Sequence, residues 1–176
     1  MMRSRGFTLL EIIIVVGILG VAGSLVIPYM NRLADFNTEG AVRRIVSDLT
    51  FAQSDAMSQQ SRRRVIFNVD PNSYRLLADP FDYDTDVLYD PLAYTGDGRY
   101  IVDFNSDPRF SGVTIEDADI DGGSNFISYD EMGGPIAPDG TASAGGVITV
   151  AGPDDRYEIR IAAFTGRVSV VDVTGL

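Results

Sequence analysis

The side chain whose position most demands a chemical explanation is Glu11, which stands inside the apolar run from Phe7 to Ile27. A carboxylate at the centre of a membrane-spanning helix costs roughly 2.5 kcal/mol or more, and less towards an interface. We therefore expect Glu11 to pair with a cation. The alternative is that Glu11 lies near the membrane surface and extends its carboxylate to water.

A second group of carboxylates has the spacing of a metal site. Asp117, Asp119 and Asp121 alternate and are followed by Gly122, as at the start of a calcium loop, where alternate side-chain oxygens converge. The twelfth position of such a loop would be Ser128, where calcium loops carry a bidentate Glu. The alternative, a solvated acidic surface loop, is the one we favour, so we expect no metal and no cofactor.

The composition excludes the most familiar enzyme sites. The chain has no His and no Cys, which removes the commonest general base near neutral pH, the thiolate nucleophile and the usual zinc ligands. An enzyme built on this chain would depend on pairs of Asp, whose proximity a sequence does not show. We therefore predict that the chain is not an enzyme.

The formal net charge is −11 and is unevenly distributed. Residues 1–64 carry eight arginines and five acidic residues, whereas residues 65–176 carry six arginines and 20 acidic residues. Such a surplus of carboxylates repels the phosphates of nucleic acids, because binding to them needs clustered Lys or Arg. We expect no nucleic-acid partner.

The elements that must position these side chains begin with a predicted membrane anchor. Residues 7–28 are almost wholly apolar, and a helix of that length spans roughly 30 Å of hydrocarbon. Arg3 and Arg5 precede it, so the positive-inside rule keeps the N-terminus in the cytoplasm and places the rest of the chain outside. A cleaved secretory signal is the alternative, but its cleavage site would need small residues where Ile27-Pro28 stands.

Helical periodicity continues beyond the anchor, through residues 29–61, and predicts one long helix from about Phe7 to Gln60. Its apolar stripe recurs at three- and four-residue steps and is expected to pack on a head domain; the stripe consists of Ala41, Ile45, Leu49, Ala52 and Ala56.

Residues 62–176 change to short β-rich runs and predict an antiparallel β-rich head, which makes the fold class α+β. Asp70 to Ser73 and Thr165-Gly166 are suited to hairpin turns. Residues 79–97 and 111–146 are rich in Asp, Gly, Pro and Ser and are expected to be long surface loops. The predicted strands are 65–69, 74–78, 100–104, 126–129, 147–151, 157–163 and 168–173.

The N-terminal sequence resembles the precursors of the type IV pilin superfamily. The resemblance rests on Arg5-Gly6-Phe7-Thr8-Leu9-Leu10-Glu11, in which a basic leader and a glycine precede Phe-Thr-Leu-Leu-Glu and an apolar helix. It implies that a prepilin peptidase cuts between Gly6 and Phe7 and that Phe7 is then N-methylated. It also implies that Glu11 neutralises the α-amino group of Phe7 on a neighbouring subunit and so sets the register of a helical stack.

A narrower resemblance, to the H-type minor pseudopilin (GspH/FimT-like) group, rests on the segment Ser47 to Ala56 and on the tail 158–170 with its Thr165-Gly166-Arg167-Val168 turn. It implies a pilin-like structural subunit of a type II secretion pseudopilus, anchored once in the bacterial inner membrane with its head in the periplasm. Its partners would be other pseudopilins or pilins, bound through the N-terminal helix. The alternative is a minor type IV pilin working in adhesion, motility or DNA uptake.

Taken together, the sequence predicts four successive parts of the chain. They are a leader peptide (1–6), a transmembrane helix (7–28), an amphipathic helix joining the head (29–61) and the β-rich periplasmic head domain (62–176).

Overall fold

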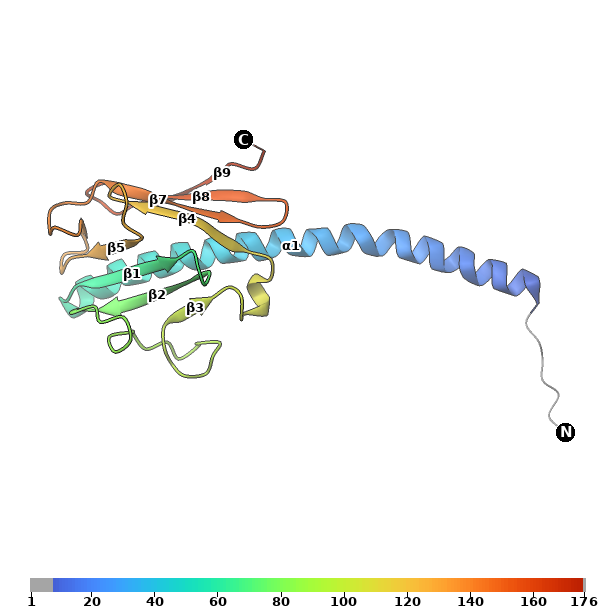
Figure 1. Cartoon of the computed structure of the whole chain (residues 1–176), viewed down its shortest axis with the longest axis horizontal. Coiled ribbons are helices and arrows are strands. Elements are labelled where there is room, and N and C mark those ends of the chain that lie inside the picture. The colour runs from blue at the N-terminus through green and yellow to red at the C-terminus, as the bar shows by residue number, and fades with distance from the viewer. Residues whose placement is uncertain (1–7, 176) are drawn as a thin grey trace. The chain divides into compact units, whose positions relative to one another are not determined.

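The computed structural model describes residues 8–175, and within that range the side chains of all residues except 24–35. The chain divides into two compact units, which are described separately: an N-terminal unit up to Leu33 and a C-terminal unit from Ala34 onward. The longest element is the helix α1, Leu9–Gln59 (Figure 1). It begins after Thr8, whose hydroxyl accepts a hydrogen bond of 3.2 Å from the backbone N of Glu11, as an N-cap residue does.

The N-terminal unit presents apolar side chains on all sides of α1. Every described side chain from Leu9 to Gly23 is exposed, including those of Leu, Ile and Val. Within the described residues, no helical stretch combines the length and the apolar character needed to cross a membrane. The predicted anchor, residues 7–28, begins at a residue outside the described range and ends among side chains that are also outside it.

In the C-terminal unit, α1 buries one stripe of side chains in the core. The predicted stripe is confirmed, because its five members share one helix face and are completely buried: Ala41, Ile45, Leu49, Ala52 and Ala56. They belong to a single apolar core that also includes residues of both β-sheets, among them Val65, Tyr74, Ile148 and Ile159.

The described residues of the C-terminal unit form two antiparallel sheets that accompany α1 (Figure 1). One has the strand order β3-β2-β1-β5-β6 and the other β4-β7-β8-β9. The strands of the first sheet are β1 Arg63–Asn68, β2 Ser73–Ala78, β3 Ile101–Asp103, β5 Phe126–Tyr129 and β6 Pro135–Ile136. Those of the second are β4 Thr114–Ile120, β7 Gly145–Ala151, β8 Arg156–Ala162 and β9 Val168–Asp172, and the 3-10 helix η1 spans Pro108–Phe110.

Both predicted hairpin turns are confirmed. β1 pairs with β2 across a turn in which Asn72 has φ 64°, and β8 pairs with β9 across a turn in which Gly166 has φ 65°. Asn and Gly are the residues that tolerate this left-handed backbone best.

The prediction of a long loop over residues 111–146 is wrong, because the segment also contains β4 and β6 in addition to the expected strand β5. β4 pairs with β7, and its register shifts between Ile115 and Asp117. Ile115 and Ile120 are both buried although they are five residues apart, an odd spacing that a regular strand would place on opposite faces. The irregularity lets both reach the core and also hides the strand from a test for strict alternation.

Candidate functional site

The predicted processing site, Gly6 and Phe7, lies outside the described residues, so cleavage and methylation stay predictions. Glu11 is described and lies in the first turn of α1, where the positive end of the helix dipole favours a carboxylate. Among the described side chains none forms a salt bridge with Glu11. The pairing of Glu11 with a cation therefore stays a prediction.

The surface around Glu11 is apolar and open. Glu11 lines a shallow depression on α1 together with Ile12, Val15 and Val16, whose side chains are exposed. A carboxylate in such a setting attracts a cation most strongly when an apolar surface packs around the pair, because exclusion of water strengthens the attraction between the two charges.

A second polar constellation is buried in the C-terminal unit around Asp48, which is 2% exposed. Its Oδ2 accepts hydrogen bonds from Arg44 Nε at 2.8 Å and from the Tyr74 hydroxyl at 2.6 Å. Its Oδ1 accepts one from the Tyr100 hydroxyl at 2.9 Å. We call these four residues the Asp48 cluster; it joins α1 to β2 and to the residue before β3.

The electrostatics of the Asp48 cluster are those of a structural anchor. Burial, followed by the charge of Asp48, raises the pKa of Tyr74 and of Tyr100 above 10, so both tyrosines remain hydrogen-bond donors at neutral pH. Burial by itself would lower the pKa of Arg44, but the hydrogen bond and charge of Asp48 outweigh it and raise that pKa. The carboxylate is closed off from solvent and its oxygens are occupied, so the cluster holds elements together and offers no substrate a reactive group.

The Asp48 cluster was not predicted from the sequence, although the sequence contains a signal for it. Asp48 stands three residues after Ile45 and four before Ala52, so it belongs to the buried stripe. A carboxylate in that position needs partners, since an unpaired buried charge is costly.

Gln53 connects α1 to two turns that are distant in sequence. Its Nε2 donates to the carbonyl O of Gly133 at 2.7 Å and to that of Thr165 at 3.1 Å. At Gly166, where φ is 65°, a Cβ would lie 3.1 Å from Cε1 of Tyr129 and 3.3 Å from Nε2 of Gln53. The segment Ser47 to Ala56, which contains Gln53, and the turn at Thr165-Gly166 carried the narrower resemblance, and they meet in the structure.

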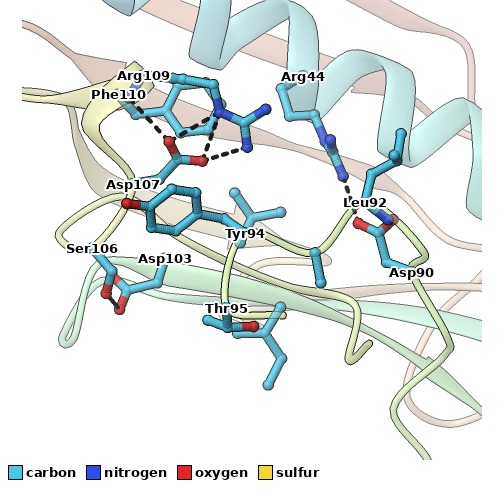
Figure 2. Close-up of a pocket in the computed structure, with 13 residues that line it drawn as sticks. Arg44, Asp90, Leu92, Tyr94, Thr95, Asp103, Ser106, Asp107, Arg109 and Phe110 are labelled. Atoms are coloured by element: carbon cyan, nitrogen blue, oxygen red, sulfur yellow. Dashed lines mark hydrogen bonds and ion pairs between the residues drawn. The ribbon is translucent and has the colours of Figure 1, made fainter. Parts of the chain in front are cut away.

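A pocket of the C-terminal unit lies between the loop at Asp90, the start of β3 and the helix η1 (Figure 2). Arg44 Nη2 donates to Asp90 Oδ2 at 3.2 Å, and Arg109 forms a fork of hydrogen bonds with Asp107, which also caps η1. Burial works to raise the pKa of Asp107, but the hydrogen bonds and charge of Arg109 outweigh it, and the pKa is lowered. Each of these arginines is thus neutralised by a carboxylate of the same pocket.

Both interpretations of the segment from Asp117 to Asp121, the calcium loop and the favoured acidic surface loop, are wrong in their geometry. Asp117 and Asp119 lie in the paired strand β4 and not in a loop. Oδ1 of Asp121 accepts hydrogen bonds from Ser143 Oγ and from the backbone N of Ala144. In the described part of the chain, no group of three or more His, Cys, Asp or Glu is arranged to hold a metal ion.

Comparisons with known proteins agree with the N-terminal motif and with the fold. A family model described as the prokaryotic N-terminal methylation motif matches residues 1–27. A search of curated protein sequences gives no match.

Two solved structures share the fold. One is the minor pseudopilin EpsH from the type 2 secretion system of Vibrio cholerae, with a TM-score of 0.53 and 10% identity over 77% of this chain and 97% of that chain. The other is the type IV minor pilin FimU of Pseudomonas aeruginosa, with a TM-score of 0.50 and 14% identity over 76% of this chain and 87% of that chain. The chain is therefore type IV pilin-like in its N-terminal motif and in its α+β fold.

Proposed function

We propose that the chain is a minor pseudopilin, a structural subunit of a type II secretion system pseudopilus involved in protein secretion. The observation that carries the proposal is an N-terminal methylation motif on a chain whose fold is like that of EpsH, itself a minor pseudopilin. The exposed apolar surface of α1 and the occupied carboxylate of Asp48 support an assembly role more readily than a catalytic one.

In this proposal the precursor is processed and anchored at its N-terminus. A prepilin peptidase removes residues 1–6 by cutting between Gly6 and Phe7, and Phe7 is N-methylated. Residues 7–28 cross the inner membrane once, residues 29–61 continue as an amphipathic helix, and residues 62–176 form the head in the periplasm. The basic leader and the apolar run that follows it support this orientation.

The cut has a chemical consequence, because it creates an α-amino group four residues before Glu11. In a stack of subunits, the amine of one Phe7 lies against Glu11 of its neighbour. The exposed Ile12, Val15 and Val16 would pack against the same neighbour and exclude water from the pair. Desolvation offsets much of the attraction, so the main effect of the pair is to select one register among the many that a smooth apolar helix allows.

The second candidate is a minor type IV pilin, and the fold shared with FimU favours it. The two functions use the same motif and differ in the filament they join. Deletion of the gene distinguishes them: loss of a secreted protein from the medium supports a pseudopilus, and loss of surface pili with normal secretion supports a pilus.

The N-terminal mass of the mature protein tests the processing step. We expect a chain that begins at Phe7 and carries one methyl group. A mature chain that keeps Met1, or one cut after Ile27, would contradict both candidate functions.

Substitution Glu11→Ala tests assembly separately from insertion. We expect the variant to reach the membrane fraction in normal amount and its incorporation into sheared filaments to fall at least about tenfold, the loss that about 1.4 kcal/mol produces. Glu39→Ala, which removes an exposed carboxylate of the same helix, is the matched control and should assemble normally. Normal incorporation of the Glu11 variant would remove this role.

A further inference from the structure

The segment 79–98, which we call the tyrosine loop, carries a surface that the proposed function does not use. It contains three tyrosines and six aspartates but no Lys or Arg. Three of its large side chains are exposed to 75% (Tyr89), 77% (Leu92) and 55% (Tyr94), and we call them the docking patch. Tyrosines of this kind are typical anchors of protein interfaces, because they bring a large contact area with few rotatable bonds.

Backbone hydrogen bonds support the tyrosine loop, both within the loop and to β2. The N of Asp90 donates to the carbonyl O of Gly98 at 2.8 Å, and the N of Leu88 donates to that of Leu76 at 2.9 Å, which ties the loop to β2. The ring of Tyr89 lies directly on Gly98, where a Cβ would come within 2.6 Å of Cε2. A surface fixed in this way loses little conformational entropy when it binds a partner.

The docking patch is also tied to the Asp48 cluster (Figure 2). Asp90 uses one carboxylate oxygen to accept from Arg44 Nη2 at 3.2 Å and the other to accept from the backbone N of Leu92 at 2.8 Å. Arg44 is itself hydrogen-bonded to Asp48 on the buried face of α1. A chain of hydrogen bonds therefore connects the exposed Leu92 to that helix. Tyr94 lines the same pocket as Asp103 and Asp107, and Figure 2 shows the three side chains together.

Two aspartates of the tyrosine loop, Asp82 and Asp97, are held in their charged form at neutral pH. Hydrogen bonds from the backbone N of Thr85 and of Asp84 lower the pKa of Asp82. Hydrogen bonds from the Thr95 hydroxyl and from the backbone N of Arg99 do the same for Asp97.

Among the described residues, four arginines contact the tyrosine loop: Arg62 forms an ion pair with Asp79, Arg44 forms one with Asp90, and two more donate to backbone carbonyls of the loop. Arg75 donates to the carbonyl O of Tyr83 and Arg99 to that of Asp84. Four guanidinium groups against six aspartates leave a formal charge of −2 (4 − 6) on this surface, and residues 65–176 as a whole are acidic.

We propose that the docking patch binds a second protein whose contact surface carries Lys or Arg around apolar side chains. Complementary charge favours such a partner. A second copy of this chain is disfavoured, since residues 65–176 carry 20 acidic residues against six arginines and the two heads repel each other. This inference rests on the proposed function in one respect: the partner is another pilin-like subunit of the same filament.

Site-specific photo-crosslinking of the full-length chain in cells tests the inference. A benzophenone amino acid replaces Leu92 or, as the matched control, Ser169 of β9, which is exposed in the other sheet. We expect at least tenfold more crosslinked product from position 92, to a protein whose contact peptide carries more Lys and Arg than Asp and Glu. In isolated membranes the yield should fall severalfold between 0.1 and 1 M salt, as the Debye length falls from about 10 to about 3 Å.

Second-site variants keep the test independent of the probe. With the probe at Leu92, Tyr94→Ala should reduce the product at least fivefold, whereas Tyr94→Phe, which keeps the ring, should retain most of it. Equal products from positions 92 and 169, a crosslink to a second copy, or a neutral or acidic contact peptide would each overturn the inference. Incorporation of the unmodified chain into filaments is measured in the same cells. If incorporation is normal, a contrary crosslinking result refutes only the proposed role of the docking patch. If incorporation is absent, the proposed function itself is refuted.

Discussion

Removal of the buried carboxylate of Asp48 should destabilise the C-terminal unit more than any exposed ion pair could. Asp48→Ala leaves the buried hydroxyl of Tyr74 and that of Tyr100 without their acceptor, and it deprives Arg44 of the nearer of its two carboxylates. Breaking a buried pair by removal of one partner costs about 3–5 kcal/mol, since the remaining polar groups stay buried and unpaired. Asp48→Asn keeps the shape and one acceptor oxygen, so we expect a smaller loss of about 1–3 kcal/mol.

The matched control is on the same helix with the same spacing. Arg43 and Glu39 form an i,i+4 ion pair of 2.9 Å whose side chains are 79% and 50% exposed, and Arg44 and Asp48 form an i,i+4 pair of 2.8 Å that is mostly buried. Glu39→Ala should therefore cost less than about 0.5 kcal/mol.

Urea unfolding of the full chain in detergent, followed by near-ultraviolet circular dichroism, measures both variants. A loss below about 1 kcal/mol for Asp48→Ala, or one equal to that of Glu39→Ala, would refute the assignment of Asp48 as the anchor between helix and sheet.

Three further predictions concern backbone strain, high pH and an unpaired hydroxyl. Gly166→Ala should lower the free energy of unfolding by about 1–2 kcal/mol because of its left-handed backbone, and by a further amount because the new Cβ contacts Tyr129. Gly140→Ala, at φ 85° in open space, should show only the cost of the left-handed backbone. Equal losses of unfolding free energy for the two variants in urea would contradict this. Burial raises the pKa of Tyr74, so above pH 10 the unfolded chain loses that proton before the folded chain does, and stability should fall by about 1.4 kcal/mol per pH unit for this residue. The slope of the Tyr74→Phe variant between pH 10 and 11.5 should be correspondingly flatter, and an unchanged slope would show that Tyr74 makes no such contribution. Tyr129→Phe removes a buried hydroxyl that has no hydrogen-bond partner among the described residues, so the stability of the chain should be unchanged or raised by up to about 1 kcal/mol. A thermal melt that shows a clear loss would contradict this.

Local patterns in the sequence predicted the elements that depend on local physics. The stripe from Ala41 to Ala56 could be read from its three- and four-residue spacing, because a helix places those residues on one face whatever packs against it. The β1–β2 and β8–β9 hairpins could be read from their turn residues, because a left-handed backbone selects Asn and Gly. The processing motif at Gly6 and Phe7 and the isolated Glu11 are likewise properties of a short stretch of chain.

The strand β4 shows why other elements could not be read in this way. Its acidic composition is typical of a loop, and the register shift beside Asp117 breaks the alternation by which a strand is recognised. Only pairing with β7, and the burial of Ile115 and Ile120 that follows, makes the segment a strand.

The sequence by itself thus determined the N-terminal motif, the helix and its buried face, and the acidic character of the head. The tertiary structure decided which carboxylates are used within the fold and which remain on its surface. Asp48 meets Tyr74 and Tyr100, 26 and 52 residues away, and Gln53 meets Thr165, 112 residues away, so their roles depend on how the sheets close around α1. The spacing of Asp48 places it on the buried face of the helix, whereas Asp82 lies in a loop and faces water. What the spacing does not supply is the pair of tyrosine hydroxyls, brought from distant segments by the tertiary structure, that satisfy the Asp48 carboxylate and so allow its burial.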